Sequence, residues 1–153
     1  MISTRTRYAL HALVYLASGS KDTAIRISEI AEANRLPRKF LENILVELKK
    51  GGLLTSRRGQ LGGYRLARPS ETIRLSEIVR ILEGPISISP CSNGGICEEC
   101  VGSGSCHLRS SFKTVNNQLW SSLDDIRLSG LVRSRSKLKQ NPKGSAKSSA
   151  RKS

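Results

Sequence analysis

All four cysteines of this 153-residue chain fall within one glycine-rich run, CSNGGICEECVGSGSC. They follow the spacing C-x5-C-x2-C-x5-C, as Cys91, Cys97, Cys100 and Cys106. Four thiolates so close in sequence can bind one zinc ion or one iron–sulfur cluster. The run holds few large apolar side chains, and its glycines let the backbone fold tightly. We therefore expect a metal centre, rather than hydrophobic burial, to organise this loop.

Two other uses of the cysteines stay open, namely a redox-active disulfide and inert thiols. The chain does not open with a basic segment followed by an apolar one, which predicts a cytoplasmic protein whose thiols stay reduced. A reducing compartment favours a metal centre over structural disulfides.

The chain is strongly basic, with 26 Lys and Arg against 12 Asp and Glu and a net charge of +14. Residues 133–153 hold eight of the basic residues and no acid, which predicts a disordered basic tail, either a solubilising end or an arm that binds phosphates nonspecifically. The remaining positive charge is compatible with binding to a polyanion such as DNA. The absence of any run of 18 apolar residues predicts no membrane-spanning helix.

The sequence contains no recognisable catalytic triad of nucleophile, base and orienting group. We therefore expect that the protein is not an enzyme.

The apolar pattern of the first 50 residues predicts three helices. The first spans residues 4–18, the second is short and capped by Ser28, and the third opens at Pro37. The apolar stripe of the third helix is predicted to be buried and consists of Phe40, Leu41, Ile44, Leu45 and Leu48. Two short helices joined by a tight turn, the second beginning with basic residues, form a helix-turn-helix pattern for the major groove of DNA.

The next segments, LLTSRR and YRLAR, predict two strands on either side of GQLGG. Such a β-hairpin would form a wing beside the helix-turn-helix, and its glycines would let the tip enter a minor groove. Four guanidiniums lie on or beside this wing, those of Arg57, Arg58, Arg65 and Arg68.

Two further helices are predicted after the wing. Ser76 is expected to cap the first of them, which runs to Glu83. The second spans about residues 107–124 and carries a single apolar seam, formed by Leu108, Phe112, Val115, Leu119, Leu123 and Ile126. The seam predicts packing against the first helix of the same chain, against the same helix of a second subunit in a homodimer, or both.

These elements predict a mainly α fold with a small β-hairpin, organised as a winged helix-turn-helix DNA-binding domain plus a long dimerisation helix. The expected divisions are the DNA-binding domain at 1–84, the cysteine-rich cluster loop at 85–106, the dimerisation helix region at 107–132 and the basic tail at 133–153.

In the order of its motifs, the chain resembles the IscR/NsrR-type family of bacterial winged-helix iron–sulfur regulators. The resemblance covers about residues 1–132 and is strongest in ISTRTRYALHAL, in FLENILVELKKGGLLTSRRGQLGGYRL and in the position of the cysteines. It implies a homodimer that binds double-stranded operator DNA, acts as a repressor, and senses redox, iron or nitric oxide status through its cluster.

The resemblance also implies which residues meet the DNA. Contacts are expected from the start of the recognition helix and from a wing arginine. Glu42 is expected to filter which sequences are accepted, and its alternative role is an exposed salt bridge with Lys39 or a neighbouring basic residue. The full set of candidate DNA-binding residues is Ser28, Arg38, Lys39, Phe40, Glu42, Asn43, Arg57, Arg58 and Gln60.

Three cysteine ligands are usual in this family, with a fourth ligand that differs between branches. At the two positions that supply this fourth ligand elsewhere, the chain has Arg7 and Arg109. The resemblance therefore implies that the extra cysteine completes an all-thiolate site, with His107 as the reserve ligand and either 2Fe-2S or 4Fe-4S as the cluster. A zinc-stabilised regulator, a cluster-free thiol switch and an iron–sulfur electron carrier remain the alternatives.

Overall fold

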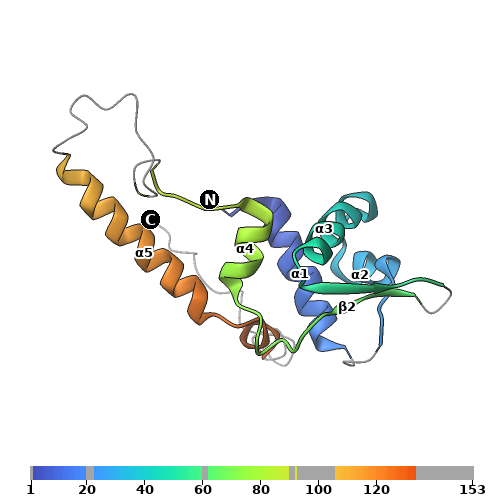
Figure 1. The fold of residues 1–153 in the computed structure, drawn as a ribbon. Coiled ribbons are helices and arrows are strands. Elements are labelled where there is room, and N and C mark those ends of the chain that lie inside the picture. Colours follow the sequence, from blue (N-terminus) through green and yellow to red (C-terminus); the bar gives the residue numbers. More distant parts are fainter. Residues whose placement is uncertain (1, 20–22, 60–61, 90–91, 93–105, 134–153) are drawn as a thin grey trace, which may run out of the picture.

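The computed structural model describes residues 2–19, 23–59, 62–89, 92 and 106–133 of the chain. The described elements follow one another along the chain as shown in Figure 1. They are α1 (Thr4–Ser18), α2 (Ile27–Asn34), α3 (Arg38–Lys50), β1 (Leu54–Arg57), β2 (Gly63–Leu66), α4 (Leu75–Glu83) and α5 (His107–Asp125). Residues 128–133 form a further short helix. The mainly α fold with one β-hairpin is thus confirmed.

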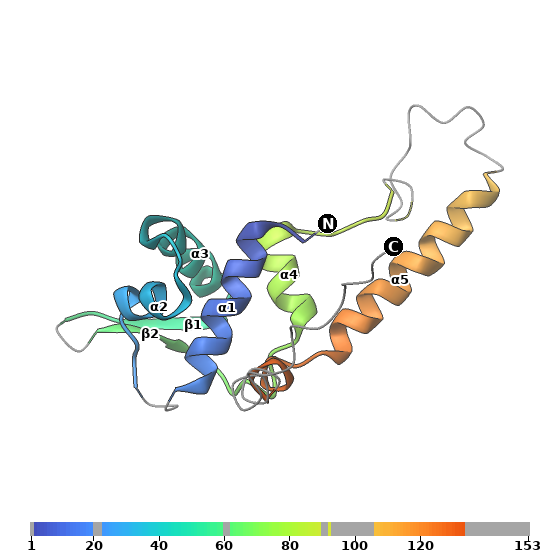
Figure 2. The same cartoon turned by 180° about the vertical axis from the view of Figure 1, so that it is seen from behind.

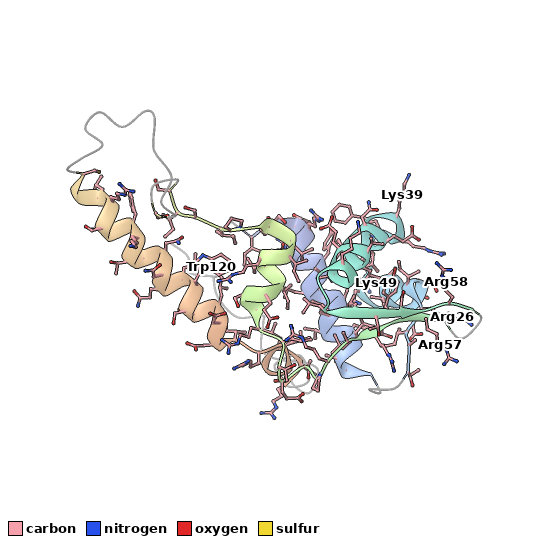
Figure 3. The ribbon with its side chains drawn as sticks, in the orientation of Figure 1. Arg26, Lys39, Lys49, Arg57, Arg58 and Trp120 are labelled. Carbon is pink, nitrogen blue, oxygen red and sulfur yellow. The ribbon has the colours of Figure 1, made fainter. Side chains whose placement is uncertain are left out.

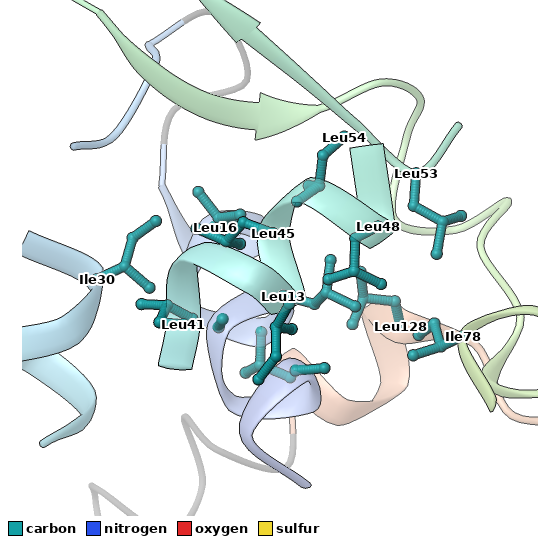
Figure 4. Close-up of a cluster of buried hydrophobic side chains, with 14 of the residues drawn as sticks. Leu13, Leu16, Ile30, Leu41, Leu45, Leu48, Leu53, Leu54, Ile78 and Leu128 are labelled. Atoms are coloured by element: carbon teal, nitrogen blue, oxygen red, sulfur yellow. The ribbon is translucent and has the colours of Figure 1, made fainter. Parts of the chain in front are cut away.

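The hydrophobic core lies where α1, α2, α3, the hairpin and α4 meet (Figure 4). Leu13 from α1, Ile30 from α2 and Leu45 from α3 are all fully buried there. Each such side chain contributes about 1.5–3 kcal/mol by leaving water, so the two helices of the helix-turn-helix are held to α1 mainly by this burial. Leu128 also lies in this core, which brings the end of the described chain back to α1, α3 and α4.

The β-hairpin is a two-stranded antiparallel sheet in which Leu54 pairs with Leu66 and Arg57 pairs with Gly63. Ile25, in the segment before α2, pairs with Tyr64 at the edge of this hairpin. The two backbone hydrogen bonds between them have N···O distances of 2.9 and 2.8 Å. A Cβ atom at position 63 would stand 2.3 Å from the carbonyl oxygen of Ile25, so only glycine permits this close approach.

Three local predictions are wrong, each because a tertiary contact decides the outcome. Ser28 does not cap α2: the bridge at Ile25 starts the helix one residue before Ser28, and Arg26 becomes its N-cap. Ser76 likewise lies inside α4, where its buried hydroxyl donates to a carboxylate oxygen of Asp124. Phe40 is not buried in the apolar stripe of α3, and its side chain remains 40% exposed.

Helix α5 is joined to α4 at its C-terminal end, and its other end extends away from the remaining helices and the hairpin (Figure 2). Leu123 packs against Leu75 and Val79 of α4. Immediately after the helix, the carbonyl of Ile126 accepts from the N–H of Leu75 at 2.9 Å, and the N–H of Leu128 donates to the carbonyl of Ile73 at 3.0 Å. We call this set of contacts the α4–α5 junction.

No helix among the described residues is both long enough and apolar enough to cross a membrane.

Glu83, the last residue of α4, forms hydrogen bonds with the N-terminal end of α1. Its carboxylate accepts hydrogen bonds from the hydroxyls of Ser3 and Thr6 and from the backbone N–H of Ser3, the last at 3.0 Å. The carboxylate thereby meets the unpaired amide and the positive end of the α1 dipole. The hydroxyls of Ser3 and Thr6, followed by the Ser3 amide, hold the pKa of Glu83 below its ordinary value of 4.5, while partial desolvation opposes them and the charge of Arg5 assists.

Replacing Glu83 by Gln should lower the free energy of unfolding at pH 7 by about 1 kcal/mol, because a charged acceptor is lost. A depressed folded-state pKa stabilises the fold above the ordinary value of 4.5, and this contribution is lost as the pH falls through the folded-state pKa. Urea denaturation at several pH values should therefore show the difference between the two proteins at pH 7 and little difference in acid. The exposed Glu71→Gln exchange is the matched control, and an equal loss in both variants would contradict the assignment.

Candidate nucleic-acid interface and cysteine site

The outer face of α3 carries the side chains expected to read DNA. Leu41, Ile44, Leu45 and Leu48 are buried against the core, and this burial orients the helix. The opposite side is exposed and consists of Lys39, Glu42, Asn43, Val46 and Lys50, which we call the outer face. It contains three of the predicted contacts, is available to a major groove, and has lysines near both ends.

A groove of about 580 Å³ lies between the start of α2, the start of α3 and the hairpin. Four predicted contacts line it together, Ser28, Arg38, Arg57 and Arg58. In Figure 3 the side chains of Arg57 and Arg58 extend from the hairpin on the side of the molecule opposite to α5, with Lys39 at the nearby end of α3. The fold therefore brings residues some 30 positions apart in sequence to one basic surface.

Two side-chain hydrogen bonds support the wing in addition to the backbone bridge between Ile25 and Tyr64. The ammonium of Lys49 donates to the hydroxyl of Ser56 on β1 at 2.7 Å, which connects the end of α3 to the hairpin. Within the hairpin, the guanidinium of Arg65 donates to the hydroxyl of Thr55 at 3.3 Å. Arg57 and Arg58 remain exposed near the tip of this supported hairpin, where phosphates or a minor groove can reach them.

Glu42 forms the exposed salt bridge that was its alternative role, with Arg38 as its partner at 3.3 Å. The two residues are one helical turn apart and both largely exposed, so the pair adds little to stability. It does direct the Arg38 guanidinium along the helix and places a carboxylate beside the DNA-facing side chains. A phosphate that approaches Arg38 must compete with this carboxylate.

The other two predicted contacts lie differently. Phe40 faces α1, where its ring meets Tyr8 edge-on with centroids 5.8 Å apart. On the same side of α3, Glu47 forms a salt bridge with Arg5 of α1. Gln60 lies outside the described residues.

Two basic residues absent from the predicted set contribute here: Arg26 belongs to the basic surface, and Lys49 supports the hairpin beside it. Arg26 lines the groove and lies beside Arg57 and Arg58 in Figure 3. The sequence held a signal for it, because a basic residue directly before a helix places a cation beside amides that attract phosphate. The role of Lys49 as a link to Ser56 depends on the hairpin and has no local signal.

Of the four candidate metal ligands, only Cys106 is among the described residues; Cys91, Cys97 and Cys100 and the side chain of His107 lie outside them. Cys106 is exposed and is the N-cap of α5. The positive end of a helix dipole favours an anionic group, and a thiolate-ligated centre is anionic. The position of Cys106 is therefore compatible with its role as a ligand of a thiolate-bound metal centre. No set of three potential metal ligands gathers within the described part of the chain.

Trp120 links α5 to α4 and to the segment that leads into the cysteine run. The guanidinium of Arg80 on α4 stands over its ring, 4.6 Å from the centroid. Its indole N–H donates to the carbonyl of Ile86 at 3.1 Å, five residues before Cys91. The entry to the cysteine run and the helix at its exit are thus attached to each other through one side chain.

Comparison with known proteins identifies the family. The family model Rrf2, described as an iron-dependent transcriptional regulator, matches residues 2–134. The chain belongs to the Rrf2 family. An Rrf2-like HTH-type transcriptional regulator of Rhodobacter capsulatus is 37% identical over 129 residues, which cover 80% of this chain and 84% of the relative.

Solved structures of similar proteins agree with the Rrf2 assignment. CymR, the global cysteine regulator of B. subtilis, superimposes with a TM-score of 0.73 at 29% identity and covers 88% of this chain and 97% of its own. IscR of T. potens superimposes with a TM-score of 0.69 at 27% identity, with 88% of each chain covered. This Rrf2 protein is therefore a transcriptional regulator with a DNA-binding fold, and not an enzyme.

Replacing Arg58 of this Rrf2 protein by Ala should weaken DNA binding and lower the slope of log affinity against log salt by about one, because one phosphate contact is lost. Fluorescence anisotropy with a labelled DNA duplex at several salt concentrations measures both quantities. Lys113→Ala removes one positive charge from an exposed position on the outer half of α5 and should leave both quantities nearly unchanged. Equal effects of the two substitutions would mean that net charge alone, and not the wing, sets the affinity.

Proposed function

We propose that this Rrf2-family regulator is a repressor that binds operator DNA as a homodimer, and that a metal centre held by Cys91, Cys97, Cys100 and Cys106 controls its affinity. One observation carries the proposal: Cys106 is the N-cap of α5, whose other end packs on α4 and leads directly to Leu128 in the main core. A change at the cysteines therefore acts on a helix that shares its packing with α4. Regulation requires only that two states of the centre differ in their affinity for DNA.

An iron–sulfur cluster is the centre that the donor set and the family support best. Four thiolates suit a 2Fe-2S or a 4Fe-4S cluster, and the description of the Rrf2 model includes iron dependence. Such a cluster would supply a redox-, iron- or nitric-oxide-sensitive group at the start of α5. Tetrahedral zinc is the second candidate, because the same four thiolates match its preferred coordination.

The homodimer is supported by the outer end of the α5 seam. Leu108 is 61% exposed and Val115 is 52% exposed, whereas Leu123, at the other end, is buried in the α4–α5 junction. The seam thus has two parts: one packs within the chain, and the other leaves apolar side chains in water. A second copy of α5 would cover the exposed part and would present two reading surfaces to the two halves of an operator.

Replacing Cys106 by Ala should abolish the visible absorption of anaerobically purified protein and change its affinity for operator DNA. Iron, sulfide and zinc analysis of the wild-type protein should give iron and sulfide together. One zinc per chain in a colourless protein would instead establish the zinc alternative. A colourless, metal-free protein whose DNA affinity changes on disulfide formation would establish the thiol switch.

Ser103→Ala in the same run, which removes no thiol, is the control for the cysteine substitution. It should keep the chromophore and the binding curve of the wild type. Cluster control is contradicted if Cys106→Ala keeps both the wild-type spectrum and the wild-type binding curve.

Replacing Val115 by Glu should convert the dimer to a monomer and weaken operator binding, because a charge would be placed in the centre of the apolar seam. Analytical ultracentrifugation measures the mass, and anisotropy measures the binding. Ser121→Glu adds the same carboxylate at an exposed position on another side of α5 and should leave the dimer intact. A dimer that withstands Val115→Glu would place the subunit interface elsewhere.

A further inference from the structure

Val46 is an apolar residue in an otherwise polar and charged strip of α3. Its side chain is 42% exposed, although it lies midway along the recognition helix. Neither burial nor helix propensity favours valine at such a position, because its branched Cβ restricts it in a helix. The side chain is therefore available for a contact that the isolated chain does not make.

The contacts of α3 define where Val46 faces. On one side, Lys49 is bonded to the wing at Ser56. On the other side, Phe40 contacts Tyr8 of α1. At about 100° per residue, Val46 falls between these two sides, within about 40° of Lys39 and Lys50 around the helix axis.

The same strip contains Asn43, nearly one helical turn before Val46. An asparagine amide can form two hydrogen bonds with adenine in the major groove, and the methyl group of thymine is the apolar feature that the bases expose there. The two central side chains of the outer face, Asn43 and Val46, therefore match the adenine and the thymine of A·T pairs.

We propose that Val46 is a specificity-determining residue that contacts a thymine methyl group, so that the recognition helix reads a half-site with an A·T step at its centre. Lys39 and Lys50, on either side of it, contact phosphates and fix the position of the helix. This inference rests on the proposed operator binding and names the bases that the outer face selects.

The test begins with selection of duplexes from a random pool by the full-length protein, purified anaerobically. Each thymine of the enriched sequence is then replaced in turn by deoxyuridine, which lacks only the methyl group. For the wild-type protein, one symmetry-related pair of positions should lose about fourfold in affinity per half-site, the value of one buried methyl group. For Val46→Ala the same replacement should have no effect, because the contacting side chain is already absent.

Matched substitutions separate this inference from a general loss of binding. Val46→Ala should keep the helical circular dichroism of the wild type, since the residue is exposed and alanine favours the helix. Lys50→Ala should weaken binding to every duplex about equally and leave the deoxyuridine pattern unchanged.

The possible failures are distinguishable. An enriched sequence with no position sensitive to deoxyuridine, or with a sensitivity that persists in Val46→Ala, would overturn the role of Val46 and leave operator binding intact. If no sequence is enriched by the wild-type protein in any metal state, sequence-specific operator binding is itself overturned, and the inference falls with it.

Discussion

The α4–α5 junction is the constraint on which the rest of the structure depends. A helix whose apolar seam is half exposed is not oriented by its own packing alone. The direction of α5 is fixed by the contacts of Leu123 and Trp120 and by the backbone pairing at residues 126–128. Because Leu128 then enters the main core, the direction of α5 is set by the same packing that positions the helix-turn-helix. In the proposed regulator, this shared packing would connect a signal at the cysteines to the reading surface on α3.

The DNA-reading elements could be predicted from the sequence because their signals are local. The apolar spacing of residues 4–18 and 41–48 defines α1 and α3, and the glycines between two short β-patterns define the hairpin. The convergence of Ser28, Arg38 and Arg58 on one groove also follows from the order of these elements. Their use as DNA contacts remains a prediction.

The misjudged details depend on contacts between distant residues. The bridge between Ile25 and Tyr64 decides where α2 begins, and Asp124 takes the hydroxyl of Ser76. Phe40 fits the apolar period of α3, yet it lies at the margin of the buried stripe, where Tyr8 of α1 covers part of its ring. Periodicity alone cannot separate a central from a marginal position in such a stripe. The cysteine site lies almost wholly outside the described residues, and its ligand set still rests on spacing and resemblance.

The length of α5 has a mechanical consequence. With 19 residues, the helix places Cys106 roughly 28 Å from the junction at its other end. A rotation of about 5° at the junction would therefore move the cysteine end by roughly 2.5 Å. If the proposed metal centre forms at Cys106, a displacement there comparable to one metal–ligand bond would correspond to a turn of only a few degrees at the junction, an angle that the packed core can accommodate.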